Sequence, residues 1–350
     1  MNKASPASTS TPATPAGQAA PGSNTPSDGA PTGGVGLLRR VLAIPEVGIL
    51  LPLLGLTLFF YWRSPVLLSP ENIGSMLRAM SFVGVVAVGL TMLMIAGEID
   101  LSVGSVAGLC AIVASHLMKD AGWPVLPSLL AGLGTGALAG LINGLLVVRL
   151  GIPAFIATLG MLYIARGGSF LISKGYPLYP LPASVESFGA ANTLGTSSSF
   201  VIFILLAVAA DVFLRRMVVG RMIYATGGNA EAARLAGVNT SGVKIACFVL
   251  TGLLAALGGL LIMARFNVGR PETGTGWELE VIAAVVIGGV SLFGGSGSMI
   301  GTLCGLAIMQ IVRSGLVISQ VNTHWQTVAL GVIMIAAVGV DLLRRRARLS

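Results

Sequence analysis

Long apolar runs, separated by short polar gaps, occupy nearly all of the sequence after residue 40. A helix that crosses the hydrocarbon core of a bilayer needs about 20 predominantly apolar residues. We predict a membrane-spanning helix wherever a run meets or approaches this length. These runs lie at about 46–62, 73–96, 101–118, 125–148, 153–172, 198–215, 241–264, 279–294, 298–316 and 324–342. The pattern therefore predicts an all-α polytopic membrane protein with about ten transmembrane helices.

Two glycine-rich segments interrupt this pattern inside the apolar part of the chain. Segment 97–104 separates the second run from the third, and segment 293–297 separates the eighth run from the ninth. Transporters often place broken helices at membrane depth, where exposed backbone lines the transport path. We therefore expect a hairpin turn, or a broken or re-entrant helix, at each segment.

The basic residues between the runs predict the orientation of the chain, because cytoplasmic gaps carry an excess of lysine and arginine. With the N-terminus inside, the inner gaps hold Arg39, Arg40, Arg149, Arg215, Arg216, Arg221, Arg234, Lys244, Arg344, Arg345, Arg346 and Arg348. The outer gaps hold Arg63, Lys119, Lys174, Arg265 and Arg270. This bias places both termini in the cytoplasm, which requires an even number of spans.

The composition supports a membrane protein and argues against a nucleic-acid partner. The chain has 350 residues, of which 54% are hydrophobic and 10% are charged, whereas soluble domains carry about 25% charged residues. Its 48 glycines suit close packing between membrane helices. The net charge of +8 is spread over the gaps between the runs, so it forms no single patch for nucleic acid.

Residues 1–36 differ from the rest of the chain. They are rich in proline, serine, threonine, alanine and glycine, and almost lack large apolar side chains. Such a segment buries too little surface to offset the entropy of ordering, so we expect a disordered tail. A signal peptide would need a basic start followed directly by an apolar stretch, which is missing here. We therefore divide the chain into a disordered tail, 1–36, and a transmembrane domain, 37–350.

The sequence lacks the signals of an enzyme or an ATPase. A phosphate-binding loop ends in Gly-Lys followed by serine or threonine. None of the four lysines, Lys3, Lys119, Lys174 and Lys244, follows a glycine. ATP-driven transport would therefore need a separate subunit. The three cysteines lie inside apolar runs without metal-type spacing, and we expect no catalytic residue, metal or cofactor.

Ion-coupled transport is the alternative source of energy. It usually requires carboxylates or histidines within the spans. The candidates are Glu98, Asp100, His116, Asp211, Glu280 and His324. Most of them lie near the end of a predicted helix, which favours an interfacial structural role over a proton relay.

Polar residues within or between the runs are the candidates for a transport pathway. Segment 97–105 reads GEIDLSVGS and places two carboxylates between two apolar runs. Asp100 or Ser102 can cap the next helix, whose positive dipole end favours an anion. The same residues can line a transport path, and the two interpretations are compatible. The candidate pathway residues are Asp100, Ser102, Asn143, Thr158 and Glu280.

Glu280 lies deeper in its apolar run than Glu278 does. An unpaired charge at that depth is costly, so we expect Glu280 to have a basic partner. Arg265 and Arg270, in the outer gap just before it, are the first candidates. The alternative is an interfacial carboxylate that faces water.

The inner gap between the sixth and seventh runs predicts a short helix with both ends marked. It reads NAEAARLAG over residues 229–237. Asn229 is a good N-cap, and Gly237 can adopt the left-handed conformation beyond the helix end. Glu231 suits the first turn and Arg234 suits the last turn. Two helical turns are not stable alone, so the membrane domain or a cytoplasmic partner must hold them.

Five motifs, taken together, resemble one family of membrane proteins. They are GRMIYATGGN (220–229), ARLAGV (233–238), GTGWELEVIAAVVIGG (274–289), GEIDLSVGS (97–105) and IPAFIATLGMLYIARG (152–167). On these motifs the chain, from about residue 40 to 342, resembles the permease subunits of bacterial ABC importers for simple sugars, of the ribose and xylose type. One departure is Glu98, where that family usually carries glycine.

The resemblance implies a function and a set of partners. A monosaccharide would pass from the periplasm to the cytoplasm through two such permeases, expected as a homodimer, in the bacterial inner membrane. A cytoplasmic ATPase subunit would dock on the inner gap, and a periplasmic sugar-binding protein on the outer loops. The implied ATPase-coupling residues are Asn229, Ala230, Glu231, Ala232, Ala233, Arg234, Leu235, Ala236 and Gly237. The alternatives are an importer of the same build for a nucleoside, a signalling furanose or another small solute such as a branched amino acid, and an ion-coupled carrier.

Overall fold

The computed structural model describes residues 45–185, 192–193, 196–322 and, with gaps, 324–339. The predicted tail, 1–36, lies outside these residues. The last predicted run is described only in part, and its described residues, between 324 and 339, are helical.

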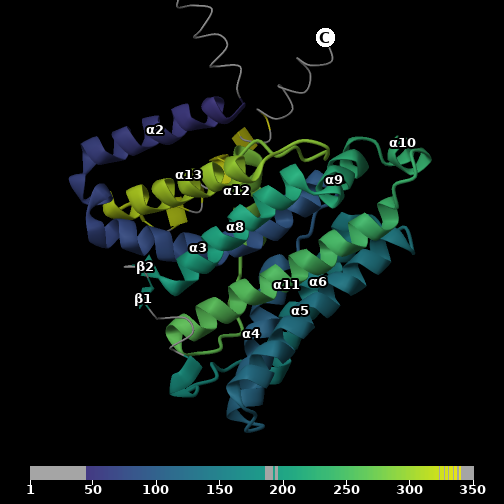
Figure 1. Cartoon of the computed structure of the whole chain (residues 1–350). Helices are drawn as coiled ribbons and strands as arrows, with labels where there is room; N and C mark the ends of the chain where they lie inside the picture. The colour runs from purple at the N-terminus through teal and green to yellow at the C-terminus, as the bar shows by residue number, and fades with distance from the viewer. Residues whose placement is uncertain are drawn as a thin grey trace, which may run out of the picture. The chain divides into compact units, whose positions relative to one another are not determined.

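The described chain is built from helices joined by short connections (Figure 1). In chain order they are α2 (Pro45–Arg63), the 3-10 helix η1 (Pro65–Leu68), α3 (Pro70–Ile95), α4 (Val103–Lys119), α5 (Val125–Val148), α6 (Ala154–Ser173), α8 (Ser198–Arg216), α9 (Val218–Gly228), α10 (Ala230–Leu235), α11 (Thr240–Phe266), α12 (Trp277–Ile287) and α13 (Met299–Ile318). Two short strands, β1 (Asn192–Thr193) and β2 (Thr196–Ser197), pair in antiparallel fashion before α8.

Among the residues that the structure describes, six helices are long and apolar enough to cross a membrane: α3, α5, α6, α8, α11 and α13. Shorter apolar helices cover Ile49–Arg63 and Val103–Lys119. Helix α12 has 11 residues, about half of the length that a span needs. The architecture fits a polytopic membrane protein, but the predicted count of about ten spans is not confirmed. The prediction of one helix over 279–294 is wrong, because the chain leaves the helix after Ile287 and turns at Gly289, whose φ is +83°.

Helix α11 is the centre of the described bundle and packs against α3, α4 and α5. Phe248, Leu254 and Leu260 on α11 are almost completely buried. The contact between α5 and α11 is close because glycines face each other, and a side chain on Gly136 would overlap the backbone at Gly252. Small residues let membrane helices approach in this way.

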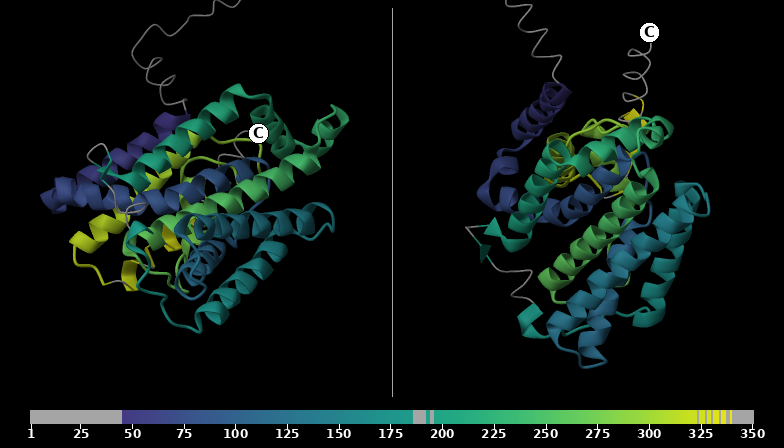
Figure 2. Two further views of the ribbon diagram at one scale, coloured as in Figure 1. Left: turned by 60° about the horizontal axis from the view of Figure 1, so that its bottom comes forward. Right: turned by 45° about the vertical axis from the view of Figure 1, so that its right-hand side comes forward.

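Both predicted breaks contain a non-helical linker, although Val103 and Gly104 of the first already belong to α4, and the two linkers lie against each other. The first linker, 96–102, joins α3 to α4, and the second, 288–298, joins α12 to α13. Gly295 N donates a hydrogen bond of 2.9 Å to Ile95 O at the end of α3. The last turn of α9 packs on this junction through Gly227. Figure 2 shows that α10 and the connection from α9 to α11 lie at the end of the bundle where α9 ends.

Candidate translocation and coupling sites

The first linker begins at a sharp helix end. Gly97 has a φ of +86°, which glycine adopts without the steric cost of a Cβ. Gly97 N donates to Met94 O at 2.9 Å, and Glu98 N donates to Leu93 O at 3.1 Å. These two bonds satisfy carbonyls that a helix end leaves open, in the pattern of a Schellman motif. The chain is thereby turned out of α3 and carried through Glu98 and Asp100 to the start of α4.

Asp100, Ser102 and Asn143 come together in the protein interior. Asp100 Oδ1 accepts hydrogen bonds from Ser102 N at 2.7 Å and from Ser102 Oγ at 2.6 Å. Asn143, on α5, donates through Nδ2 to Ser102 Oγ at 3.0 Å and to Asp100 Oδ2 at 3.3 Å. Asp100 is 2% exposed, and the other two side chains are fully buried. The structure therefore joins three of the five predicted pathway residues.

The cluster includes both capping candidates. The Asp100 carboxylate binds the N–H of Ser102, the residue that precedes α4, so Asp100 bonds the backbone one position before the helix begins. The side chain of Ser102 binds no backbone N–H of α4. Asn143 Oδ1 has no hydrogen-bond partner among the described residues, which leaves one acceptor of the cluster unused.

The other two predicted pathway residues do not join the cluster. Thr158 Oγ1 donates to Ala154 O, one turn earlier on α6. Glu280, in the first turn of α12, forms an ion pair with Arg313 of α13, with 3.1 Å between Oε1 and Nη1. The expectation of a basic partner is confirmed, but Arg265 and Arg270 were the wrong candidates. The partner comes from α13, which packs beside α12, and no spacing in the sequence reveals this packing.

Arg166 is a functional candidate that the sequence analysis did not single out. It lies within α6, and its Nη1 donates to the carbonyl oxygens of Pro271 at 2.9 Å and Thr273 at 3.0 Å. These carbonyls belong to the segment between α11 and α12, which packs on α4 at Gly108. The signal was available, because a charged residue inside a predicted span is a functional candidate by default.

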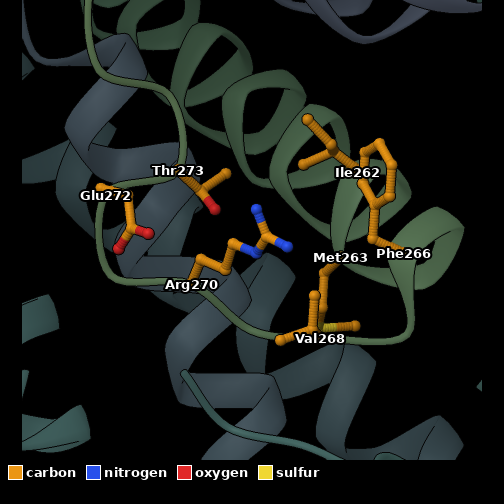
Figure 3. Close-up of a pocket in the computed structure, with 7 residues that line it drawn as sticks. All are labelled: Ile262, Met263, Phe266, Val268, Arg270, Glu272 and Thr273. Carbon is orange, nitrogen blue, oxygen red and sulfur yellow. The ribbon is translucent and has the colours of Figure 1, made fainter. Parts of the chain in front are cut away.

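The same segment forms one wall of a pocket of about 180 Å³. Its lining residues are Ile262, Met263, Phe266, Val268, Arg270, Glu272 and Thr273. Figure 3 shows the Arg270 side chain extending into the pocket, between Thr273 and Met263. The pocket lies where α11 ends, at the opposite end of that helix from α10.

The predicted short helix is present and is capped as expected. Helix α10 starts after Asn229, whose Oδ1 accepts a hydrogen bond of 2.9 Å from Ala232 N. It ends at Leu235, and Gly237, two positions later, has a φ of +88° and donates through its N–H to Arg234 O at 3.0 Å. The preceding helix, α9, was not predicted. It contacts α10 and α11 and supplies the support that two turns alone would lack.

The implied coupling residues are not all exposed on α10. Leu235 is 80% exposed, whereas Ala233 is 6% exposed. Ala233 therefore packs inside this chain and cannot seat α10 in a cleft of a partner. The residues available to a partner are Glu231, Ala232, Arg234, Leu235, Ala236 and Gly237.

Two side-chain contacts connect this end of the bundle to the linkers. Tyr224, on α9, donates its hydroxyl to Gly297 O in the second linker at 2.8 Å. Burial raises the pKa of the Tyr224 phenol, so the hydroxyl keeps the proton that it donates. Lys244, near the start of α11, pairs with Glu98 in the first linker at 2.5 Å. The sequence analysis used Lys244 only as an orientation signal.

Comparisons with known proteins identify a family and several relatives. Residues 72–338 match the family described as branched-chain amino acid transport system / permease component. The ribose import permease protein RbsC of Escherichia coli (strain K12) is 37% identical over 284 residues, which cover 79% of this chain and 88% of the relative.

Two further relatives are named for other substrates. The autoinducer 2 import system permease protein LsrC of Enterobacter sp. (strain 638) is 34% identical, with 89% of this chain and 90% of the relative covered. The L-arabinose ABC transporter permease protein AraH of Azospirillum brasilense is 36% identical, with 81% and 84% covered. No solved structure matches this chain significantly. On the family match and these identities, the chain belongs to the family of branched-chain amino acid transport system permease components.

Proposed function

We propose that this chain is the transmembrane permease of an ATP-driven ABC importer that carries a monosaccharide, such as ribose or arabinose, from the periplasm to the cytoplasm. The observation that supports this most is its similarity, over most of its length, to permeases named for ribose and arabinose import. A relative named for autoinducer 2 import supports a signalling furanose as the second candidate. A nucleoside or a branched amino acid is a further alternative.

The proposed protein works in the bacterial inner membrane with three kinds of partner. A second permease, expected as another copy of this chain, completes the pathway. A cytoplasmic ATPase subunit hydrolyses ATP, because no lysine here follows a glycine as a phosphate-binding loop requires. A periplasmic sugar-binding protein delivers the substrate. The distribution of basic residues supports cytoplasmic termini, and the chain would then cross the membrane an even number of times, ten by our proposal.

We assign the first linker to the translocation pathway. It carries the buried polar cluster of Asp100, Ser102 and Asn143, whereas the surrounding helices are apolar. Irregular backbone at membrane depth is tolerated where it is enclosed by protein or lines a cavity. Thr158 and Glu280 remain pathway candidates on α6 and α12, away from this cluster.

Proteoliposomes containing the permease, its ATPase subunit and the binding protein test the function directly. We expect uptake of radiolabelled ribose or arabinose that requires ATP inside the vesicles and the binding protein outside. Uptake by the permease alone, driven by a proton or sodium gradient, would establish the ion-coupled alternative instead. Displacement of the labelled sugar by autoinducer 2 or a nucleoside, but not by unlabelled sugars, would change the substrate class.

We also propose that α10 is the helix that couples the permease to the ATPase. ATP binding can shift the permease only through contacts that differ between its two states, and α10 presents a short, exposed, capped surface for such contacts. The six exposed residues from Glu231 to Gly237, four on α10 and two just after it, are the proposed contact surface.

Replacing Leu235 by aspartate is expected to separate coupling from folding. Leu235 is 80% exposed, so the variant should reach wild-type amounts in the membrane. Co-purification of the ATPase subunit and sugar uptake should each fall about tenfold, which corresponds to about 1.4 kcal/mol of lost contact energy. The matched control is Leu150→Asp in the connection between α5 and α6, where the leucine is 69% exposed. Normal ATPase binding by the Leu235 variant would place the contact elsewhere.

A further inference from the structure

An ion pair connects the first linker to the start of α11. Lys244 Nζ donates to Glu98 Oε1 at 2.5 Å, and 146 positions of sequence separate the two residues. The Lys244 side chain is 23% exposed and that of Glu98 is 13% exposed. Such a partly buried pair is screened by water and salt much less than a pair on the open surface. It is therefore able to resist separation of the two segments that carry it.

Lys244 lies close to the segment that we propose for ATPase coupling. Helix α11 begins after its N-cap Asn239, whose Oδ1 accepts from Gly242 N at 2.9 Å. Only a few residues lie between that cap and Leu235, the last residue of α10, and α10 contacts α11 directly. A displacement of α10 therefore moves the first turns of α11, and Lys244 with them.

Glu98 lies at the other end of the pair, two positions before Asp100. Asp100 is itself held by Asn143 of α5. Helix α5 packs closely on α11, and a side chain on Gly144 would lie 3.1 Å from the Cα of Ile245. The α5–α11 pair thus holds the linker at two points, through the charge on Glu98 and through the amide that bonds Asp100.

The contacts on the opposite side of the linker are of a different kind. A side chain on Gly97 would lie 3.5 Å from the Cα of Gly227, at the end of α9. A packing contact of this kind resists compression but does not resist separation, because dispersion attraction between two atoms is weak. The ion pair and the hydrogen bonds from Asn143 are contacts of this linker that can pull it as well as hold it, and the ion pair is the one that attaches it to the start of α11.

We propose that the Glu98–Lys244 ion pair transmits the displacement of α10 to the linker that carries Asp100, so that both residues are positioning residues for transport. This inference rests on the proposed function. Coupling then depends on the presence of opposite charges at these two positions. It does not depend on the size or the helix propensity of the two side chains. Exchange of the two charges should therefore preserve coupling, whereas loss of either charge should interrupt it.

The test uses the full transporter in proteoliposomes, with ATPase subunit and binding protein, and ribose and arabinose as probes. Glu98→Gln and Lys244→Gln should keep wild-type yields and ATPase co-purification, because each glutamine is close in size to the residue it replaces. Uptake should fall at least tenfold in each, while ATP hydrolysis continues and the ATP used per sugar rises. The double variant Glu98→Lys with Lys244→Glu should recover uptake to within threefold of wild type.

A second ion pair provides a matched control. Asp211 and Arg215 lie one turn apart on α8, with 2.9 Å between Oδ1 and Nε. Removal of both charges with Asp211→Asn and Arg215→Gln should change uptake less than twofold, because this pair connects no two elements.

Three results would overturn the inference. They are near-normal uptake in both glutamine variants, loss of uptake that is not recovered by the exchanged pair, and loss of uptake in proportion to folded yield. Failure of the proposed function would look different. The wild-type complex would then show no ATP-dependent uptake of either sugar, and Leu235→Asp would bind the ATPase subunit normally.

Discussion

Substitution of Gly227 by alanine is expected to remove most of the assembled protein from the membrane. The Cβ of that alanine would overlap Ile95 O and lie 2.7 Å from Gly295 N. These two atoms form the hydrogen bond that joins the linkers. The obstacle is backbone on both sides, so no change of side-chain rotamer can relieve it.

We expect this overlap to lower the free energy of unfolding by about 3 kcal/mol, the upper end of the range for overpacking. A loss of about 1–2 kcal/mol already changes protein abundance several-fold in cells, so we expect at least a fivefold decrease. Size-exclusion chromatography of a fluorescent fusion, solubilised in mild detergent, measures the folded amount.

The neighbouring glycine is the matched control. A Cβ on Gly228 would have its nearest neighbour, the Cα of Gly295, at 4.0 Å, which is an ordinary contact. Gly228 lies in the last turn of the same helix, and its replacement by alanine adds the same methyl group. The Gly228→Ala variant should keep wild-type amounts and gain up to about 1 kcal/mol of helix propensity. Equal yields of the two variants would show that the junction of α9 with the linkers tolerates a side chain.

The positions of the helices were predictable because hydrophobic runs report the apolar surroundings of each helix directly. Nine of the predicted runs contain a helix that the structure describes in full, from α2 to α13. The lengths were less predictable. Apolar composition continues through 279–294 although the helix stops at Ile287, because Val290, Leu292 and Phe293 follow it. Hydropathy indicates which residues are buried but not where a helix ends. Here the helix ends because the chain turns at Gly289, which adopts the left-handed conformation.

The candidate site was predictable where its residues are close in sequence. Asp100 and Ser102 are two positions apart, and local capping chemistry was enough to join them. The partner of Glu280 and the link between Glu98 and Lys244 depend on helices that are distant in sequence and adjacent in space. Ala233 illustrates a third limit, because in a helix of six residues no periodicity indicates which face is buried.

Asp100→Leu should abolish assembly, whereas Asp100→Asn should preserve it. Leucine offers no acceptor, so Ser102 N and the Asn143 amide, both buried, would lose bonds that Asp100 now accepts. Each buried donor left without a partner costs about 1–3 kcal/mol, so the two together cost about 2–6 kcal/mol, a large part of the about 5–15 kcal/mol that stabilises a typical fold.

Asparagine keeps the first of these bonds, because its Oδ1 can accept from Ser102 N as the carboxylate does and asparagine caps helices well. Its new amide group would face Asn143 Nδ2, and rotation of the Asn143 amide would present Oδ1, which has no partner among the described residues. Asp100→Asn should therefore keep most of the folded protein and most of the sugar uptake.

Asp120→Leu is the control, because that carboxylate lies at the other end of α4 and its side chain is 43% exposed. Thermal unfolding in detergent and uptake by proteoliposomes measure the two effects separately for each variant. Wild-type transport by Asp100→Leu would show that neither capping nor a pathway role is needed at this position. Normal assembly without transport in Asp100→Asn would instead assign the essential property of Asp100 to its negative charge, since the asparagine keeps the cap and removes only that charge.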